Sequence, residues 1–436
     1  MLRQLAILGA CSIAIGSIAN ARAETPADWA TKHVSELIEL YRQLHEQPEL
    51  SSQEEKTAAR LAAIWKQAGI EVHTGIGGHG IVGILKNGPG PTLMLRTDLD
   101  ALPVVENTGL AYASQIKVKA KDGTTIGVMH ACGHDIHMTN LTGVAQFLAS
   151  HKSAWSGTVM FVGQPAEETG KGARGMLADG LFKRFPQPDM ALAMHVDATL
   201  ETGKIGYRAG YTLANVDSVD ITMRGRGGHG ASPQSVIDPI VQAAQLVMSL
   251  QTIVSREMNP VEPAVVTVGS IHGGAKHNVI PDTCHLQLTV RSFSDEVRQR
   301  ILDAIRRKAD AVAAGAGAPK PTVEVIDEHT PALLNDEKLV ERILPMLRKT
   351  LGEANVVTSE PAMGGEDFSR YGRAGVPVCM LRLGSVEPKR LAGLKRGGQE
   401  PPSLHSAVYY PDAEQTLVVG VNALSNAAMD LLPPKK

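Results

Sequence analysis

The chain has little of several features that would define its class directly. Only 4% of its 436 residues are aromatic, its net charge at pH 7 is −2, and it has four cysteines. Without an excess of basic residues, we expect neither nucleic acid nor an anionic membrane as a partner. Four cysteines in so long a chain do not make a disulfide-stabilised scaffold. The remaining composition, 43% hydrophobic, is that of a globular protein long enough for two or three domains.

The first 23 residues have the pattern of a cleavable secretory signal. Arg3 supplies positive charge, residues 5–18 are mostly apolar, and Ala21-Arg22-Ala23 is an A-x-A cleavage site. The apolar run is shorter than the ~20 residues that a membrane span needs. A lipidation site at Cys11 is an alternative, but the apolar segment before it is short and continues past it. We expect a mature chain that begins at Glu24 and is periplasmic or secreted, free of the membrane after cleavage.

Residues 130–137, His-Ala-Cys-Gly-His-Asp-Ile-His, place one cysteine and three histidines within eight positions. Thiolate and neutral imidazole are ligands that zinc and similar divalent metals prefer. A helix-compatible run follows, so Cys132 and His134 are expected on a loop that enters a helix, whose free N–H groups favour a thiolate. Signal removal leaves three cysteines, so at least one thiol has no disulfide partner. A histidine-rich surface loop is the alternative interpretation.

Polar side chains follow three short apolar runs that are typical of buried strands in an α/β sheet. Asp98 and Asp100 follow the first, Glu167 and Glu168 the second, and His195 the third. Open α/β sheets bind ligands at the carboxyl ends of their strands. Because all three ends carry metal-ligand chemistry, we predict a metal site at this edge of the sheet.

The pattern of elements changes near residue 214. From there to residue 329 the predicted order is β-α-β-β-α-β, the split unit of ferredoxin-like domains. We predict an α/β fold with a mixed-sheet catalytic domain in two parts, residues 24–213 and 330–436, with helices on both faces. Residues 214–329 form an inserted ferredoxin-like lid or dimerisation domain. Residues 389–402, rich in glycine, proline and lysine, are expected to form a mobile loop.

Several motifs occur in order along nearly the whole mature chain. They are RTDLDALP (96–103), HACGHD (130–135), QPAEE (164–168), GRGGHGASP (225–233), NVIPD (278–282), GGEDF (364–368) and LHS (404–406). Together they resemble the metallopeptidase family of aminoacylases, carboxypeptidase G, hippurate hydrolase and plant auxin-conjugate amidohydrolases. The chain is most similar to the amidohydrolase branch.

The resemblance implies a homodimeric hydrolase that uses two divalent metals, zinc or manganese, to cleave N-acyl amino acids or related small conjugates. It implies as metal ligands Cys132, His134, Glu168, His195 and His405, with the cysteine as the bridge. Glu167 would be the general base, Asp100 would orient a ligand, and His229 would stabilise the oxyanion from the neighbouring subunit. Many other branches have a histidine ligand at the position of Asp98 and a bridging carboxylate at that of Cys132.

Arg291 and Asn278 match polar positions on the substrate side of the family's cleft. A guanidinium can hold a carboxylate through two hydrogen bonds, so we expect substrates with a free α-carboxylate beside the scissile amide. An exposed arginine in a solvated strand is the alternative. Six histidines outside the motifs are expected at the surface or in loops: His73, His79, His151, His272, His277 and His285. His130 and His137 are candidates for supporting the site.

Three other functions fit parts of the sequence. A dipeptidase or carboxypeptidase could use the same scaffold. A cysteine hydrolase could use Cys132 as nucleophile and His134 as base, and it would survive chelation. A non-catalytic metal- or ligand-binding protein is the third, but it has no use for a base such as Glu167 beside a ligand.

Overall fold

The computed structural model describes residues 24–120, 123–326 and 329–434. The predicted signal peptide, residues 1–23, lies outside the described residues, so export stays a prediction. Within the described ranges, none of the helices combines the length and apolar character needed to cross a bilayer.

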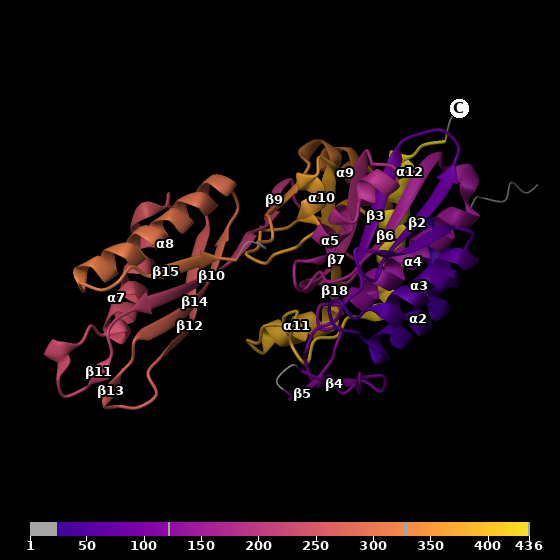
Figure 1. Cartoon of the computed structure of the whole chain (residues 1–436). Coiled ribbons are helices and arrows are strands. Elements are labelled where there is room, and N and C mark those ends of the chain that lie inside the picture. The colour runs from indigo at the N-terminus through magenta and orange to yellow at the C-terminus, as the bar shows by residue number, and fades with distance from the viewer. Residues whose placement is uncertain (1–23, 121–122, 327–328, 435–436) are drawn as a thin grey trace, which may run out of the picture.

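An eight-stranded mixed sheet is the centre of the larger part of the molecule (Figure 1). In spatial order its strands are β1 (Glu71–Ile76), β2 (Gly80–Asn87), β6 (Gly157–Gln164), β3 (Thr92–Asp98), β7 (Met190–Glu201), β18 (Val378–Val386), β8 (Ile205–Tyr207) and β17 (Val356–Thr358). The four strands β6, β3, β7 and β18 are mutually parallel, whereas β2 is antiparallel to β6 and β8 to β18. The predicted mixed sheet is therefore confirmed.

Both faces of the central strands are buried because apolar residues occupy successive positions. In β3, Leu93 and Leu95 belong to one core, and Met94 between them belongs to the other. The first core is completed by α1 (Pro26–Lys32), α2 (Val34–Glu46), α3 (Glu55–Gln67), α4 (His134–Ser150), α9 (Glu337–Leu351) and α12 (Ala413–Leu431). The second is completed by α5 (Gly172–Ala178), α6 (Leu181–Arg184) and α10 (Ser369–Arg373). Helices thus cover both faces, as predicted.

A second, four-stranded antiparallel sheet lies apart from the first (Figure 1). Its strands in spatial order are β12 (Ala264–Gly273), β14 (Thr283–Ser292), β10 (Asn215–Arg224) and β15 (Thr322–Val325). Helices α7 (Pro239–Thr252) and α8 (Asp295–Gly315) share one core with this sheet. The strand order is that of the ferredoxin-like split unit, and the domain boundaries at 213/214 and 329/330 stay a prediction.

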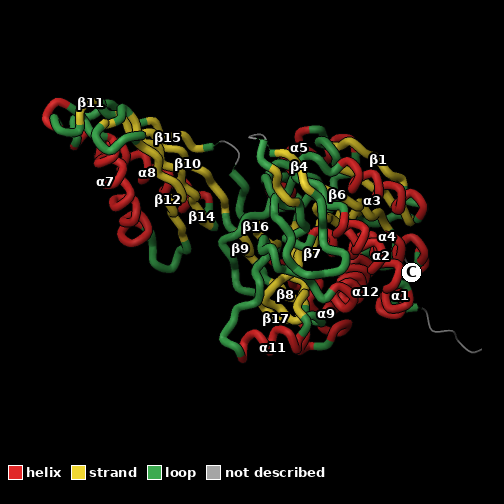
Figure 2. The backbone as a smooth tube through the Cα atoms, turned by 90° about the horizontal axis from the view of Figure 1, so that it is seen from below, coloured by secondary structure: helices red, strands yellow, loops and turns green. Residues whose placement is uncertain are grey.

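Two short strands join the sheets where the chain leaves and re-enters the larger part (Figure 2). They are β9 (Gly210–Leu213) and β16 (Leu333–Asn335), which pair antiparallel. Two further antiparallel pairs are β4 (Lys117–Lys119) with β5 (Thr125–Gly127), and β11 (Gly228–His229) with β13 (Val279–Ile280). The β11–β13 pair is at the tip of the smaller sheet that is distant from the larger part (Figure 1).

The expected mobile loop at 389–402 is wrong in its first half, because Pro388–Arg396 forms helix α11. Pro388 occupies the first turn, where its missing N–H costs nothing, and the Glu387 carboxylate accepts a hydrogen bond from the Arg390 N–H. Leu391 is buried and holds the helix against the protein. The strand that was expected to end before His195 also continues, since β7 runs to Glu201.

Helices α4 and α12 approach closely at Gly143, and this contact generates a stability prediction. A Cβ atom there would lie 2.7 Å from Val421 Cγ2 and 3.3 Å from Leu37 Cδ2. We expect Gly143→Ala to lower the free energy of unfolding by about 1–3 kcal/mol through overpacking, measured by urea denaturation. Gly393→Ala in α11 is the matched control, because a Cβ there meets nothing within 4 Å. Equal changes in the free energy of unfolding for the two substitutions would show that helix propensity, not packing, determines the effect at Gly143.

Candidate active site

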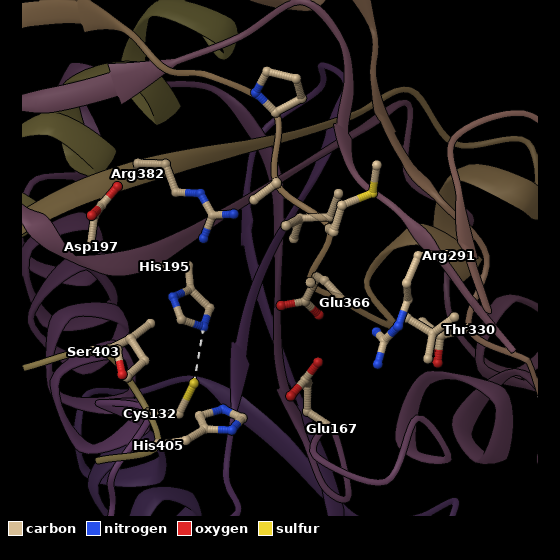
Figure 3. A pocket seen from close by; sticks show the side chains of 18 of the residues that line it. Cys132, Glu167, His195, Asp197, Arg291, Thr330, Glu366, Arg382, Ser403 and His405 are labelled. Carbon is tan, nitrogen blue, oxygen red and sulfur yellow. Dashed lines mark hydrogen bonds between the residues drawn. The ribbon is translucent and has the colours of Figure 1, made fainter. Parts of the chain in front are cut away.

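The five predicted metal ligands come from four segments and meet at one edge of the large sheet. Figure 3 labels three of them, Cys132, His195 and His405. Cys132 precedes α4, His134 is its first residue, Glu168 follows β6, His195 lies in β7, and His405 precedes α12. The ligand atoms of Cys132, His134 and His195 lie within 4.8 Å of one another, as do those of Cys132, Glu168 and His405. Cys132 belongs to both groups, which is the arrangement expected of a bridging ligand.

The atoms that face this cluster are free to bind a metal. His134 Nδ1 donates to the Asp100 carbonyl oxygen at 2.8 Å, and His195 Nδ1 donates to the Val196 carbonyl oxygen at 2.8 Å. These bonds fix the tautomers and leave each Nε2 with its lone pair. His134 Nε2 and Glu168 Oε1 are buried without a hydrogen-bond partner among the described residues. The donor set therefore fits divalent metal ions.

A glycine at position 133 shapes the loop that carries Cys132. Gly133 has φ of 77°, and a Cβ there would lie 2.6 Å from Val196 Cγ2.

Burial raises the pKa of the Cys132 thiol, and the Glu168 carboxylate raises it further. A thiolate here therefore requires a cation such as a bound metal, and an unassisted cysteine nucleophile is disfavoured.

Glu167 lies on the wall of the cleft next to these ligands, opposite Glu366 (Figure 3). Carboxylate oxygens of Glu167, Glu366 and Asp367 lie within 4.8 Å of one another. Burial raises the pKa of Glu167 well above its usual value, and Glu366 and Glu168 add to the rise. A carboxyl group in this environment can both accept and return a proton near neutral pH.

A buried arginine balances the acidic groups behind the site. Arg96 contacts Asp98 at 2.7 Å, Glu366 at 2.9 Å and Asp367 at 3.2 Å. The other oxygen of Asp98 contacts His137 Nδ1 at 2.7 Å, so this histidine supports the site through a carboxylate. The sequence motifs included Glu366 and Asp367 but gave neither a role; the signal was an adjacent acidic pair after two glycines.

Asp100 touches two of the ligand segments. Besides the carbonyl bond to His134, its Oδ2 accepts hydrogen bonds from Ser51 Oγ at 2.6 Å and from the Glu168 N–H at 3.0 Å. These contacts are compatible with the ligand-orienting role implied by the family resemblance.

Backbone strain is concentrated around the site. Among the described non-glycine residues, positive φ angles occur at Ser52 (67°), Ala166 (52°) and His405 (67°). The Glu54 carboxylate accepts the N–H groups of Ser52 at 2.7 Å and Ala166 at 2.8 Å. Since Ala166 directly precedes Glu167, this buried carboxylate fixes the direction of the glutamate pair, a feature that the motifs did not reveal.

A cleft of about 1190 Å³ extends from these residues to the smaller sheet. Arg291, Thr289 and Val265 line it from β14 and β12. In β14 the alternation of side chains puts Leu288 and Val290 in the core under the helices, so Thr289 and Arg291 point to the helix-free face. Of the two predicted substrate-binding residues, Arg291 is thus in the cleft.

His229 and Asn278 are not in the cleft of their own chain. Both are exposed and lie in or beside the β11–β13 pair at the distant tip of the smaller sheet. The Gly230 N–H donates to the Asn278 carbonyl at 2.9 Å, which ties the two segments together. Within one chain these two residues do not join the ligand cluster.

A histidine clamped between two carboxylates supports the loop from behind. His45 Nδ1 lies 2.6 Å from Asp135 Oδ2, and its Nε2 lies 3.1 Å from Glu106 Oε1. All three side chains are buried. Asp135 follows the predicted ligand His134, so this network connects α2 to the start of α4.

The model of the peptidase family M20/M25/M40 matches residues 94–396. The chain is 35% identical over 339 residues to thermostable carboxypeptidase 1 of Saccharolobus solfataricus, covering 77% of this chain and 82% of that protein. It is 36% identical over 341 residues to N-acetyl-L-cysteine deacetylase of Bacillus subtilis, covering 77% of each.

Two further similarities cover more of the chain. N-acetyldiaminopimelate deacetylase of Limosilactobacillus reuteri is 35% identical over 398 residues, covering 89% of this chain and 96% of that one. A dinuclear metal binding peptidase of the M20 family from Bacillus subtilis superposes with a TM-score of 0.75 at 30% identity, covering 93% of this chain and 99% of the other.

The His45 network predicts a pH dependence of stability. Burial alone would lower the pKa of His45, but the hydrogen bonds with Asp135 and Glu106 outweigh it and raise the pKa to about 10. The unfolded value is about 6.5, so the stabilisation is complete below that pH and is lost as pH rises through 10. We expect His45→Gln to lower the free energy of unfolding by about 2–4 kcal/mol at pH 6. This difference from the wild type should shrink steadily toward pH 10.

Urea midpoints at half-unit pH intervals measure this difference. His33→Gln is the control, because His33 pairs with Glu36, whose side chain is 76% exposed. A deficit of the His45 variant that stays constant from pH 6 to pH 10 would contradict a charged His45.

Proposed function

The chain belongs to the peptidase family M20/M25/M40, and from this premise we propose that it is a two-metal amidohydrolase that cleaves N-acyl amino acids or related small conjugates. One observation carries the proposal: Cys132 is shared by two ligand groups that flank Glu167 on the wall of a cleft. The names of two relatives, N-acetyl-L-cysteine deacetylase and N-acetyldiaminopimelate deacetylase, support an N-acyl substrate. A carboxypeptidase is the second candidate, supported by the thermostable carboxypeptidase among the relatives.

In this proposal Cys132, His134 and His195 would hold one metal, and Cys132, Glu168 and His405 would hold the other. Such ions would supply polarisation of the scissile carbonyl and acidification of a water molecule. Zinc or manganese fits the set, and the thiolate favours zinc.

The chain's own residues then complete the reaction. Glu167 takes a proton from the attacking water and returns it to the nitrogen of the leaving amine, as its raised pKa allows. Asp100 keeps the His134 ring in place through its carbonyl oxygen. Arg291 has no carboxylate partner within 4 Å among the described residues, and we propose that it holds the α-carboxylate of the substrate.

We also propose a homodimer in which the smaller sheet forms the interface. Among the described strands, the edge strand β12 is paired on one side only, and α7 exposes Met248 at 71% and Val241 at 53%. His229 and Asn278 are too distant for the cleft of their own chain. A dimer would let His229 of the partner subunit stabilise the oxyanion.

Glu167→Gln tests the proposed general base. We expect turnover of N-acetyl amino acids to fall at least ~10²-fold, with the metal content by elemental analysis unchanged. Cys132→Ala is the comparison variant and is expected to lose both metal and activity, because it removes the shared ligand. Full activity of metal-loaded Glu167→Gln would refute this assignment, and two metals per chain in Cys132→Ala would show that the thiolate is no ligand.

Mixing two inactive variants tests the shared site. A heterodimer of Glu167→Gln and His229→Ala contains one site with both residues intact. After random exchange half of the dimers are mixed, so about a quarter of wild-type activity should return. Subunit exchange is followed by native mass spectrometry. An absence of recovery in confirmed heterodimers would mean that His229 does not act across the interface.

A further inference from the structure

A second guanidinium, Arg382, faces the cleft and has no role in the reaction described above. It lies in β18, is half-buried, and lines the cleft. Its guanidinium has no hydrogen-bond or ion-pair partner among the described residues. This distinguishes it from Arg96, whose charge is balanced by three buried carboxylates. A partly desolvated guanidinium without a partner is prepared to bind an anion.

The sheet directs this side chain toward the site. Arg382 is paired with His195 of β7 on one side and with Gly206 of β8 on the other. Its neighbours Leu381 and Leu383 belong to the core of the opposite face. A Cβ at Gly206 would lie 3.1 Å from the Arg382 Cβ, so the glycine keeps room beside the arginine.

The guanidinium groups of Arg291 and Arg382, which have no carboxylate partner among the described residues, lie on different sides of the candidate catalytic residues. Figure 3 shows Arg291 on the side of Glu167 and Glu366, and Arg382 on the side of His195 and Asp197. Glu167 must reach the leaving nitrogen, so the amino acid part of the substrate belongs on the side of Arg291. The acyl part then extends toward Arg382.

We propose that Arg382 forms an anion subsite for the acyl group, so that the preferred substrates are N-acyl amino acids whose acyl chain ends in a carboxylate. This inference rests on the proposed function. A singly charged carboxylate fits better than a phosphate dianion, because Asp197 and Glu360 line the same cleft. Among the described residues Asp197 forms no ion pair with Arg382 within 4 Å; its Oδ1 accepts hydrogen bonds from the N–H and Oγ1 of Thr199.

The test compares two acyl groups of equal size on the same amino acid, N-succinyl and its neutral amide, N-succinamoyl. We expect wild-type kcat/KM to favour the succinyl compound by about 10- to 100-fold. The ratio should fall to about one in Arg382→Gln and stay partly preserved in Arg382→Lys. Arg291→Gln is the matched control. It should lower kcat/KM for both compounds and leave the ratio of the two values unchanged.

Two results would overturn the subsite. One is a wild-type ratio of one or less. The other is an equal loss of both substrates in Arg382→Gln, which would mean that the arginine acts only through the electrostatics of His195.

Binding separates the subsite from the proposed reaction. Calorimetry on the metal-loaded Glu167→Gln protein should give a lower Kd for the succinyl compound, and this difference should vanish in Glu167→Gln/Arg382→Gln. If binding shows that pattern but the wild type hydrolyses neither compound, the subsite stands and the hydrolase assignment fails. If the wild type hydrolyses both compounds without a charge preference in rate or Kd, the subsite fails and the hydrolase stands.

Discussion

Negative charge buried at the carboxyl ends of β3 and β6 is the constraint on which the surrounding structure depends. A carboxylate cannot stay ionised away from water unless a cation or hydrogen-bond donors compensate it. Arg96 balances the group behind the site, His45 balances Asp135 below the loop, and the cluster around Cys132 is left to metal ions. Each of these three groups of carboxylates is therefore compensated by a different cation.

The fold was predictable where local pattern decides. The strand order of the smaller sheet followed from its sequence of elements, and the strand ends that carry Asp98 and Glu168 followed from apolar runs. The edge strand β1 was missed because it is largely exposed and alternates weakly. Helix α11 was missed because its composition resembles a loop, whereas its start is set by Pro388 and the cap from Glu387.

In the candidate site, too, local sequence patterns predicted some residues and not others. Cys132 and His134 stand together in the chain, so their chemistry was visible from their spacing. The hydrogen bond from the Ala166 N–H to the Glu54 carboxylate joins segments 112 residues apart, and no local pattern contains it. Arg382 was hidden for a related reason: in an apolar strand it is a single charged residue, and only the pairing with His195 and Gly206 shows that it reaches the cleft.

The left-handed backbone at Ser52, Ala166 and His405 has a consequence for attempts to engineer this protein. Each of these residues raises the energy of the native state by about 1 kcal/mol or more, which glycine would relieve. Glycine substitutions at these three positions would therefore be among those that a search for heat-tolerant variants samples. The same replacements would make the backbone around Glu167 and His405 more flexible. Selection for thermal tolerance alone would therefore be expected to reduce catalytic activity.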